Sequence, residues 1–273
     1  MMQEVRRRLQ VFLIVFLIVT LFGSVGFMML ENLSFADAFY YSIVTMSTVG
    51  YGDIHPTSQA SRMFAVLLIV MGGATFFGVI ANATEILILR RELKNRARKV
   101  NMVLGVFFSE VGYKLLGLFS NHDSNISEVR KNLLVTTSWT DIRFATALKI
   151  IKKYKGEMEI AELNLGELSI FLRSKRDFLL GLLENPVLIE HDDFSDALLS
   201  VFHLLDELTA RNELRALPES DIKHLAGDIN RVYIKLIIQW VIYLRHLKEE
   251  YPYLFSLAMR TNPFNKDASP VVV

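Results

Sequence analysis

Two long apolar stretches constrain this sequence more than any other feature. The first runs from Leu9 to Leu30 and holds no charged residue. At about 1.5 Å of rise per residue, a helix of this length crosses the roughly 30 Å hydrocarbon core of a membrane. The second, Met63 to Leu89, is also long enough to span, with Asn82 and Glu85 near its end. We therefore expect two transmembrane helices.

Basic residues indicate how these spans are oriented. Three arginines at 6–8 precede the first span, and Arg62 is the one basic residue between the two spans. A basic cluster follows the second span: Arg90, Arg91, Lys94 and Arg96. Because short cytoplasmic segments carry an excess of Lys and Arg, we expect both termini in the cytoplasm, at the plasma or inner membrane. The basic cluster is also expected to attract anionic lipid headgroups, at about 1 kcal/mol per charge.

The segment between the spans begins with a helix signal. Ser34-Phe35-Ala36-Asp37 reads as a capping box, so a short helix should begin near Phe35 and run to about Met46. A short helix and the extended stretch after it cannot lie exposed to lipid, because their backbone groups would be unsatisfied there. We therefore expect this segment to face protein or water.

The extended stretch TVGYG, from Thr48 to Gly52, has a specific physical use. Glycines at alternate positions allow backbone angles that other residues avoid, so successive carbonyls can point the same way. Such lines of carbonyls around an axis replace the water shell of a monovalent cation, with the Thr48 hydroxyl adding the innermost ring. One chain supplies one line, so a pore of this kind needs four chains, a homotetramer.

The stretch TMSTVGYGD, set between two spans and after a short helix, resembles the pore of the potassium channel family with two transmembrane helices per subunit. The resemblance covers residues 9–91. It implies potassium ions in a selectivity filter and no organic cofactor. The filter residues that it assigns are Thr48, Val49, Gly50, Tyr51 and Gly52.

The same resemblance implies supporting contacts around the filter. It makes Tyr51 a brace against the pore helix and places Asp53 at the outer mouth. Many members carry an acidic residue behind the filter, but the matching position here is Val44, so that pair is absent. Tyr40 stands where a second common partner is found, and we predict a hydrogen bond between Tyr40 and Asp53.

The second span contains Gly72-Gly73 near its middle. The resemblance places a gating hinge here, although small residues also serve close helix packing in membranes. Which glycine bends is left open. If Gly73 is the hinge, helical spacing assigns the pore lining to Ala74, Phe77, Ala81, Asn82 and Glu85. A ring of Glu85 side chains would concentrate cations at the inner mouth. The alternative is that Glu85 lies at the level of the lipid headgroups and is hydrated there.

The rest of the chain reads as helical. Residues 101–119 form an apolar stripe, on a helix that either lies along the inner membrane surface or packs on the tail. From residue 127 onward apolar residues recur at helical spacing, with Trp139 as a core or interface anchor. We expect an all-α membrane protein with a pore domain over 1–95, an amphipathic linker helix over 96–126 and a cytoplasmic helical bundle over 127–273. The bundle resembles no characterised module.

Ligand-binding signals in the tail are weak. His203 lies in an apolar stripe and is expected in the core, and Asp221-x-x-His224 resembles half of a di-iron motif whose other members are missing. A weak divalent site is conceivable at one acidic group, although helix capping explains Asp193 and Asp196 as well. The members of this group are Glu190, Asp192, Asp193 and Asp196.

Composition excludes several other classes of protein. The sequence has no cysteine, so thiolate metal sites and cysteine nucleophiles are excluded, and a net charge of +1 argues against nucleic-acid binding. No nucleophile and base arrangement stands out, so an enzyme is not expected. We predict a homotetrameric potassium channel, conducting passively and gated or assembled by its tail. The alternative is a signalling protein whose tail is a receptor for a partner and whose ion flux is secondary.

Overall fold

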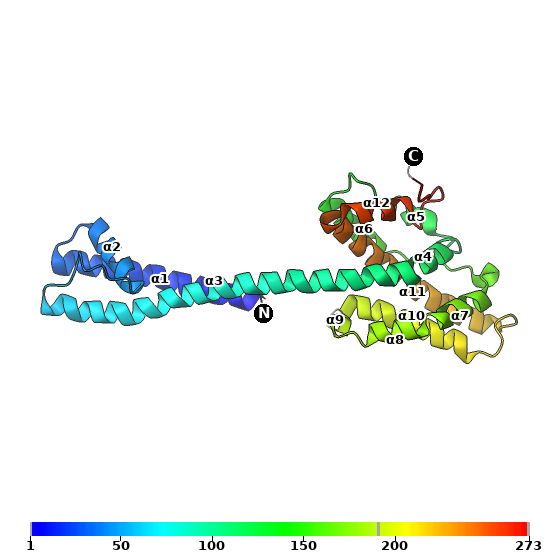
Figure 1. The fold of residues 1–273 in the computed structure, drawn as a ribbon, viewed down its shortest axis with the longest axis horizontal. Helices are drawn as coiled ribbons and strands as arrows, with labels where there is room; N and C mark the ends of the chain where they lie inside the picture. Colours follow the sequence, from blue (N-terminus) through cyan, green and yellow to red (C-terminus); the bar gives the residue numbers. More distant parts are fainter. Residues whose placement is uncertain (1, 190–191, 272–273) are drawn as a thin grey trace. The chain divides into compact units, whose positions relative to one another are not determined.

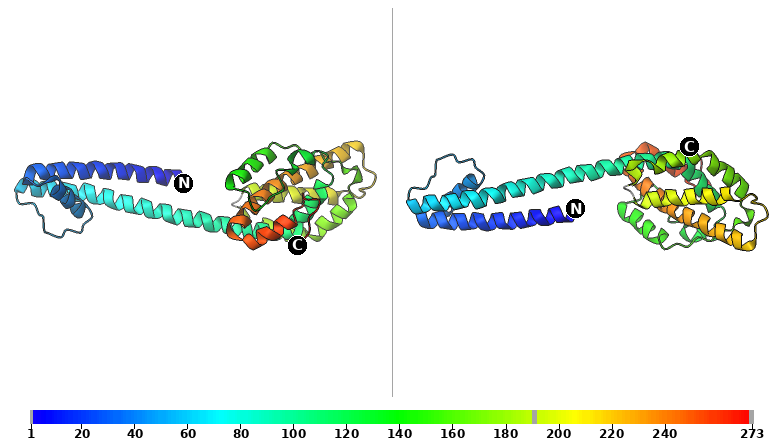
Figure 2. Two further views of the ribbon diagram at one scale, coloured as in Figure 1. Left: turned by 90° about the horizontal axis from the view of Figure 1, so that it is seen from above. Right: turned by 90° about the horizontal axis from the view of Figure 1, so that it is seen from below.

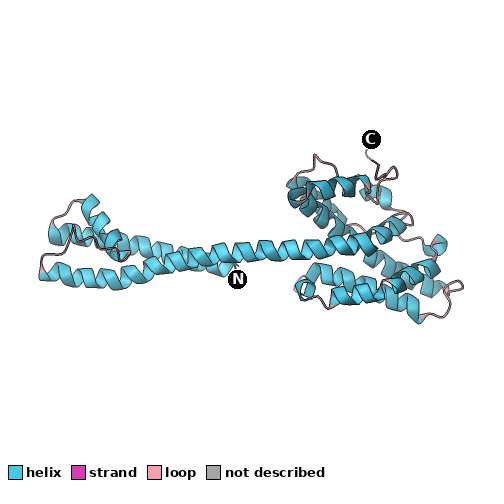
Figure 3. Ribbon diagram, in the orientation of Figure 1, coloured by secondary structure: helices cyan, strands magenta, loops and turns pink. Residues whose placement is uncertain are grey.

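The computed structural model describes residues 2–189 and 192–271. Over these residues every regular element is a helix and no strand is present, as Figure 3 shows; one isolated bridge joins Asp123 and Met158. The chain divides into two compact units, Met1–Asn95 and Arg96–Val273, which we call the first and the second unit. The predicted all-helical class is therefore right.

The first unit contains α1 (Met2–Glu31), α2 (Phe35–Met46) and the beginning of α3 (Gln59–Phe107). Both α1 and the stretch that begins with α3 are long and apolar enough to cross a membrane. They run side by side in Figures 1 and 2, and aromatic rings join them: Phe27 meets Phe64 edge-on with ring centroids 5.1 Å apart. A Cβ on Gly26 would come within 2.2 Å of the Phe64 ring, so this glycine permits the close approach.

Helix α2 has the predicted bounds. Its N-cap Ser34 accepts a hydrogen bond from the Asp37 backbone N–H at 3.2 Å and donates its hydroxyl to the Asp37 carboxylate at 2.7 Å. On the inner side of α2, Tyr41 meets Phe27 of α1 edge-on at 4.5 Å, and Met46 is fully buried. This packing fixes the direction in which α2 delivers the chain to the TVGYG stretch.

A polar clamp joins the end of α1 to the start of α3. The Glu31 carboxylate accepts hydrogen bonds from the Thr57 backbone N–H at 2.8 Å, from the Thr57 hydroxyl at 2.7 Å and from the Ser58 N–H at 3.3 Å. Ser58 in turn accepts from the Ser61 N–H at 3.1 Å, which caps the first turn of α3. The outer ends of the two long helices are thereby held together.

The second unit is a bundle around α11 (Glu219–Glu250), which packs against α4, α6, α10 and α12 (Figure 1). Trp240 and Tyr233 of α11 are fully buried, and Trp139 is buried against Phe144 with ring centroids 5.1 Å apart. Its elements besides α11 and the end of α3 are η1 (Phe108–Gly112), α4 (Tyr113–Ser120), α5 (Ile126–Arg130), α6 (Asp141–Ile151), η2 (Ile160–Glu162), α7 (Leu165–Ser174), α8 (Arg176–Leu183), α9 (Pro186–Ile189), α10 (Asp192–Ala210) and α12 (Pro252–Arg260).

Residues 101–119 lie inside this bundle. Leu104, Phe107 and Leu115 are buried in its core, and Phe108 stacks on Tyr243 of α11 with ring centroids 5.5 Å apart. The sequence left open whether this stretch follows the membrane or the tail, and the structure places it in the tail. The stretch over 96–126, expected as a separate linker, belongs to the second unit, and its apolar stripe supplies part of the core of that unit.

Candidate functional site

The backbone of the TVGYG stretch alternates in handedness. Thr48, Gly50 and Gly52 have positive φ angles of 60°, 54° and 81°, whereas Val49 and Tyr51 between them do not. In an ordinary strand, successive carbonyls point to opposite sides, but alternation between left- and right-handed backbone turns them toward one side. The left-handed backbone that the glycine spacing predicts is present at Gly50 and Gly52.

Hydrogen bonds to α2 orient the first carbonyls. The N–H groups of Val49 and Gly50 both donate to the Val44 carbonyl, at 3.1 and 3.4 Å. All peptide bonds of the described chain are trans, and in a trans peptide the C=O points opposite to the N–H. The carbonyls of Thr48 and Val49 therefore point away from the Val44 carbonyl of α2.

The positive φ of Thr48 is a feature that sequence reasoning missed. A β-branched residue in this region is uncommon, and its strain costs on the order of 1–3 kcal/mol. The Thr48 N–H is held by the Thr45 carbonyl at 3.1 Å, in the turn that ends α2. Glycine spacing marks positions 50 and 52 only, because threonine carries no signal for a left-handed backbone.

The predicted hydrogen bond between Tyr40 and Asp53 is present. The Tyr40 hydroxyl donates to Asp53 at 2.8 Å, and the other Asp53 oxygen accepts from the Ile54 N–H at 3.0 Å. Tyr51, in contrast, is 72% exposed and Val49 is 52% exposed within one chain. A single chain therefore does not supply the brace that the resemblance implies for Tyr51.

The two glycines of α3 differ in their surroundings. A Cβ on Gly72 would lie 2.2 Å from Met46 Cγ, so Gly72 is needed for the close approach of α2 to α3. A Cβ on Gly73 would meet its nearest neighbour, the Met46 carbonyl oxygen, at an ordinary 3.9 Å. The packing alternative thus applies to Gly72, and the hinge assignment remains a prediction for Gly73.

The expected pore-lining residues do not all share one face of α3. Ala74, Phe77, Ala81 and Glu85 are exposed. Asn82 is only 8% exposed and donates its side-chain N–H to the Gly78 carbonyl at 2.7 Å. It lies about 100° around the helix from Ala81, on the side where Gly78 packs against Phe12 of α1. The expectation that Asn82 faces the same side as the others is corrected by this burial.

The described residues of the acidic group, Asp192, Asp193 and Asp196, do not converge on a common point. Asp192 and Asp193 are exposed in the first turn, and Asp196 is paired with Lys235 at 2.7 Å, while Glu190 lies outside the described residues. His203 is not in the core as expected, since 48% of its side chain is exposed. It faces Glu207 and Asp228 instead, a cluster that sequence reasoning missed.

The four residues of the basic cluster after the second span are exposed: Arg90, Arg91, Lys94 and Arg96.

Two protein families match this chain. Residues 96–260 match the family described as "Uncharacterized protein MJ1433, C-terminal helical domain", and residues 14–88 match the ion channel family. The uncharacterized protein MJ1433 of Methanocaldococcus jannaschii is 45% identical over 175 residues, which are 64% of this chain and 70% of that protein.

Potassium channels match this chain over shorter stretches. The voltage-gated potassium channel Kch of Escherichia coli is 54% identical over 43 residues, 16% of this chain and 10% of that channel. Two pore potassium channel b of Oryza sativa subsp. japonica is 35% identical over 81 residues, 29% of this chain and 23% of that channel. The chain thus spans less than a quarter of the length of these two channels, and the resemblance seen in its pore loop is confirmed.

Proposed function

We propose that this chain, which belongs to the family of the C-terminal helical domain of the uncharacterized protein MJ1433 and carries an ion channel domain at its first unit, forms a potassium-selective pore. The observation that carries the proposal is the alternating backbone of Thr48–Gly52, whose first carbonyls turn away from α2. In the pore, these oxygens replace the hydration shell of a potassium ion, and repulsion between ions in single file drives passive conduction.

A homotetramer completes the site. One chain provides one line of carbonyls, and the large exposed surfaces of Val49 and Tyr51 need cover in a membrane protein. Neighbouring copies of the chain supply this cover, and a neighbour's pore helix supplies the surface that Tyr51 braces. Potassium is the transported ion, and the proposal includes no organic cofactor and no catalytic step.

The inner half of α3 forms the gate in this proposal. Gly73 bends, Ala74, Phe77 and Ala81 line the cavity, and Glu85 concentrates cations at the inner mouth. The basic cluster that begins at Arg90 contacts anionic headgroups of the inner leaflet, which places both termini in the cytoplasm.

The second unit gates or assembles the pore. Deletion after Asn95 separates these roles better than a cut near residue 120, because residues 101–119 belong to the core of the second unit. A gating role changes the open probability of an intact tetramer, whereas an assembling role lowers the yield of tetramer and leaves the open probability unchanged. The partner-binding alternative is favoured by an apolar cleft of about 780 Å³ in this unit, lined by Met102, Val106 and Leu257 among others.

Selective ion binding tests the proposal without a gating stimulus. Purified full-length protein is heated in equal concentrations of potassium and sodium, and the melting of the tetramer is followed by size-exclusion chromatography. Binding to the native state alone raises the melting temperature, so potassium should protect the tetramer more than sodium. Equal protection by the two ions, or none, would contradict a potassium-selective filter.

A further inference from the structure

The second unit contains a cluster of metal-binding side chains that the proposed channel function does not use. We propose that His203, Glu207, His224 and Asp228 bind one divalent transition metal ion of the zinc class. Two come from α10 and two from α11, the helices that form the centre of the bundle. The proposal concerns the tail alone and stands whether or not the pore conducts.

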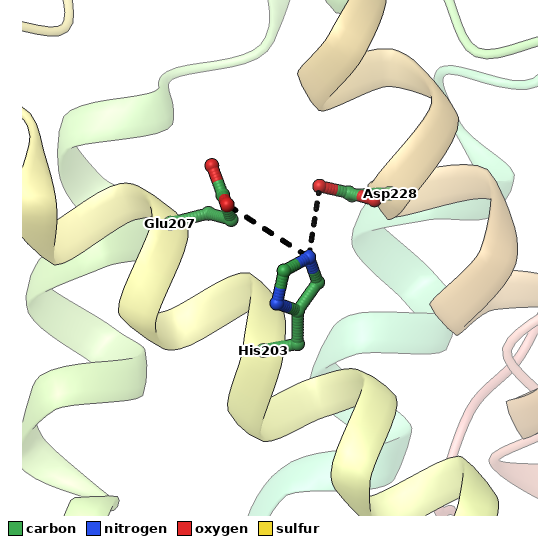
Figure 4. Close-up of side chains that lie close together, drawn as sticks. All are labelled: His203, Glu207 and Asp228. Atoms are coloured by element: carbon green, nitrogen blue, oxygen red, sulfur yellow. Dashed lines mark ion pairs between the residues drawn. The ribbon is translucent and has the colours of Figure 1, made fainter.

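Helical spacing arranges the four residues as two pairs on neighbouring helices. His203 and Glu207 lie four positions apart on α10, and His224 and Asp228 lie four positions apart on α11, so each pair occupies one face of its helix. Figure 4 shows His203, Glu207 and Asp228 pointing toward one another across the two helices. One ligand atom from each of these three residues lies within 4.8 Å of the others. His224 lies outside this three-residue group and approaches it at Asp228 and Glu207.

The distances between ligand atoms suit a metal better than direct hydrogen bonds. Asp228 Oδ2 is 3.5 Å from His203 Nε2 and 3.4 Å from His224 Nε2. Glu207 lies 3.9 Å from His203 Nε2 through Oε1 and 3.5 Å from His224 Nε2 through Oε2. Ligands that hold zinc at about 2.1 Å in a tetrahedron are separated by about 3.4 Å. Hydrogen bonds between such atoms are about 2.7–3.2 Å long, so these separations exceed them.

A buried and unpartnered oxygen points independently to a ligand. Asp228 is 2% exposed, and among the described residues its Oδ2 has no hydrogen-bond donor. An isolated ionised carboxylate is costly to bury, so this oxygen needs a cation or a donor. The two imidazoles beside it are about half exposed, which leaves a path from solvent to the site.

Arginines contact both carboxylates and fix their orientation. Arg231 forms an ion pair with Asp228 Oδ1 at 2.9 Å, which leaves Oδ2 toward the histidines. Arg211 donates to Glu207 Oε2 at 2.7 Å, and this hydrogen bond lowers the pKa of Glu207 below its ordinary value. Hydrogen bonds and ion pairs from residues that do not touch the metal commonly fix the orientation of metal-binding carboxylates.

The donor set selects the class of metal. Two imidazole nitrogens and two carboxylate oxygens suit zinc, cobalt or nickel, whereas magnesium and calcium take oxygen ligands almost exclusively. Two carboxylates also neutralise the charge of a divalent ion when both histidines are neutral. The alternative is that either histidine is protonated and neutralises the Asp228 carboxylate without a metal. The cluster would then consist of ion pairs between histidines and carboxylates.

Metal binding to the full-length protein tests the proposal. The detergent-solubilised chain is stripped with a chelator, titrated with Zn²⁺ by calorimetry, and titrated separately with Co²⁺, whose visible absorption reports tetrahedral coordination. We expect one ion per chain and an intense tetrahedral Co²⁺ spectrum. His203→Gln and His224→Gln, both at half-exposed positions, should each weaken Zn²⁺ binding at least 100-fold, since loss of a residue that only hydrogen-bonds to a metal ligand already costs about 10- to 100-fold.

His122→Gln serves as the matched control, because His122 lies in the same unit but binds the Leu118 carbonyl outside the cluster. It should leave the Zn²⁺ affinity unchanged. Asp228→Asn should abolish the Co²⁺ spectrum, and the two histidine variants keep the test valid if this buried change prevents folding. Equal Zn²⁺ affinity of wild type and both histidine variants would overturn the proposal. So would a wild-type protein whose melting temperature follows pH through the histidine range but does not respond to Zn²⁺.

Discussion

The Tyr40 hydroxyl lies 2.8 Å from a carboxylate oxygen of Asp53, so one hydrogen bond joins the short helix before the TVGYG stretch to the residue that follows it. The two residues that this bond joins flank the Thr48–Gly52 stretch in the sequence. The position of Val44 offers no acidic partner, so Tyr40 provides the polar support on this side of the loop.

Removing that bond should destabilise the conducting loop. Tyr40→Phe keeps the ring and deletes the hydroxyl, so the current at a constant open stimulus should decline up to about fivefold faster, as expected for loss of one hydrogen bond. Tyr41→Phe deletes a hydroxyl from the same helix and leaves the Tyr40–Asp53 bond in place, so its time course should match wild type. If the current of Tyr40→Phe declines at the wild-type rate, the Tyr40–Asp53 hydrogen bond does not stabilise the loop.

The adjacent glycines of α3 should respond differently to the same substitution. Gly72→Ala places a methyl group against Met46 and should cost about 1–3 kcal/mol of stability, measured as a lower melting temperature of the tetramer. Gly73→Ala meets no such obstacle and should keep the melting temperature, while lowering the open probability because alanine stiffens the helix. Equal destabilisation by both changes would contradict the division between a packing and a hinge glycine.

The filter backbone should tolerate no side chain at Gly50. A Cβ there meets nothing within 4 Å, so any effect of Gly50→Ala comes from its φ of +54°, which costs about 1–2 kcal/mol in each chain. Potassium flux into liposomes should fall at least about tenfold, because a left-handed backbone is needed to align the carbonyls. Gly117→Ala is the matched control, since its Cβ also meets open space and its φ is not positive. Wild-type flux in Gly50→Ala would argue against the alternating backbone as the ion site.

Local signals in the sequence predicted much of the first unit. Ser34 and Asp37 marked the start of α2, the glycines at 50 and 52 marked the turns of the filter, and the Tyr40–Asp53 contact followed from the resemblance. The left-handed backbone at Thr48 was missed because it is imposed by the turn at Thr45, not by the threonine itself.

The remaining features depend on tertiary packing, which the sequence alone does not reveal. The face of Asn82 depends on where α1 lies, and residues 101–119 read equally well as a membrane-surface helix until α11 is seen to cover them. The cluster around Asp228 was missed for the same reason. The spacing His-x-x-x-Glu at 203–207 and His-x-x-x-Asp at 224–228 was a usable signal, but it gains meaning only when α10 and α11 are known to be neighbours.

Low pH should destabilise the folded second unit by protonating the two carboxylates that Arg211 binds. Its guanidinium donates to both Asp221 oxygens and to Glu207, and these hydrogen bonds lower the pKa of both carboxyl groups below their ordinary values of 3.8 and 4.5. Because the folded state holds fewer protons than the unfolded state, this stabilisation is complete at neutral pH and is lost as the pH falls through the lowered values.

Arg211→Gln should therefore lower the melting temperature at neutral pH, with a difference from wild type that shrinks as the pH falls below the ordinary carboxyl values of 4.5 and 3.8. Arg215→Gln removes an exposed arginine nearby and should follow the wild-type curve at every pH. A constant difference between Arg211→Gln and wild type across this range would mean that the arginine acts through packing and not through these two carboxylates.

Ion flux is the most direct test of the central claim, the selectivity of the Thr48–Gly52 loop. Purified full-length protein is reconstituted into liposomes, and potassium efflux is compared with sodium efflux while internal pH and calcium are varied to find an open state. The account predicts potassium flux well above sodium flux, at a rate proportional to the amount of reconstituted tetramer. Equal fluxes of the two ions, or no flux from a verified tetramer under every condition, would contradict it.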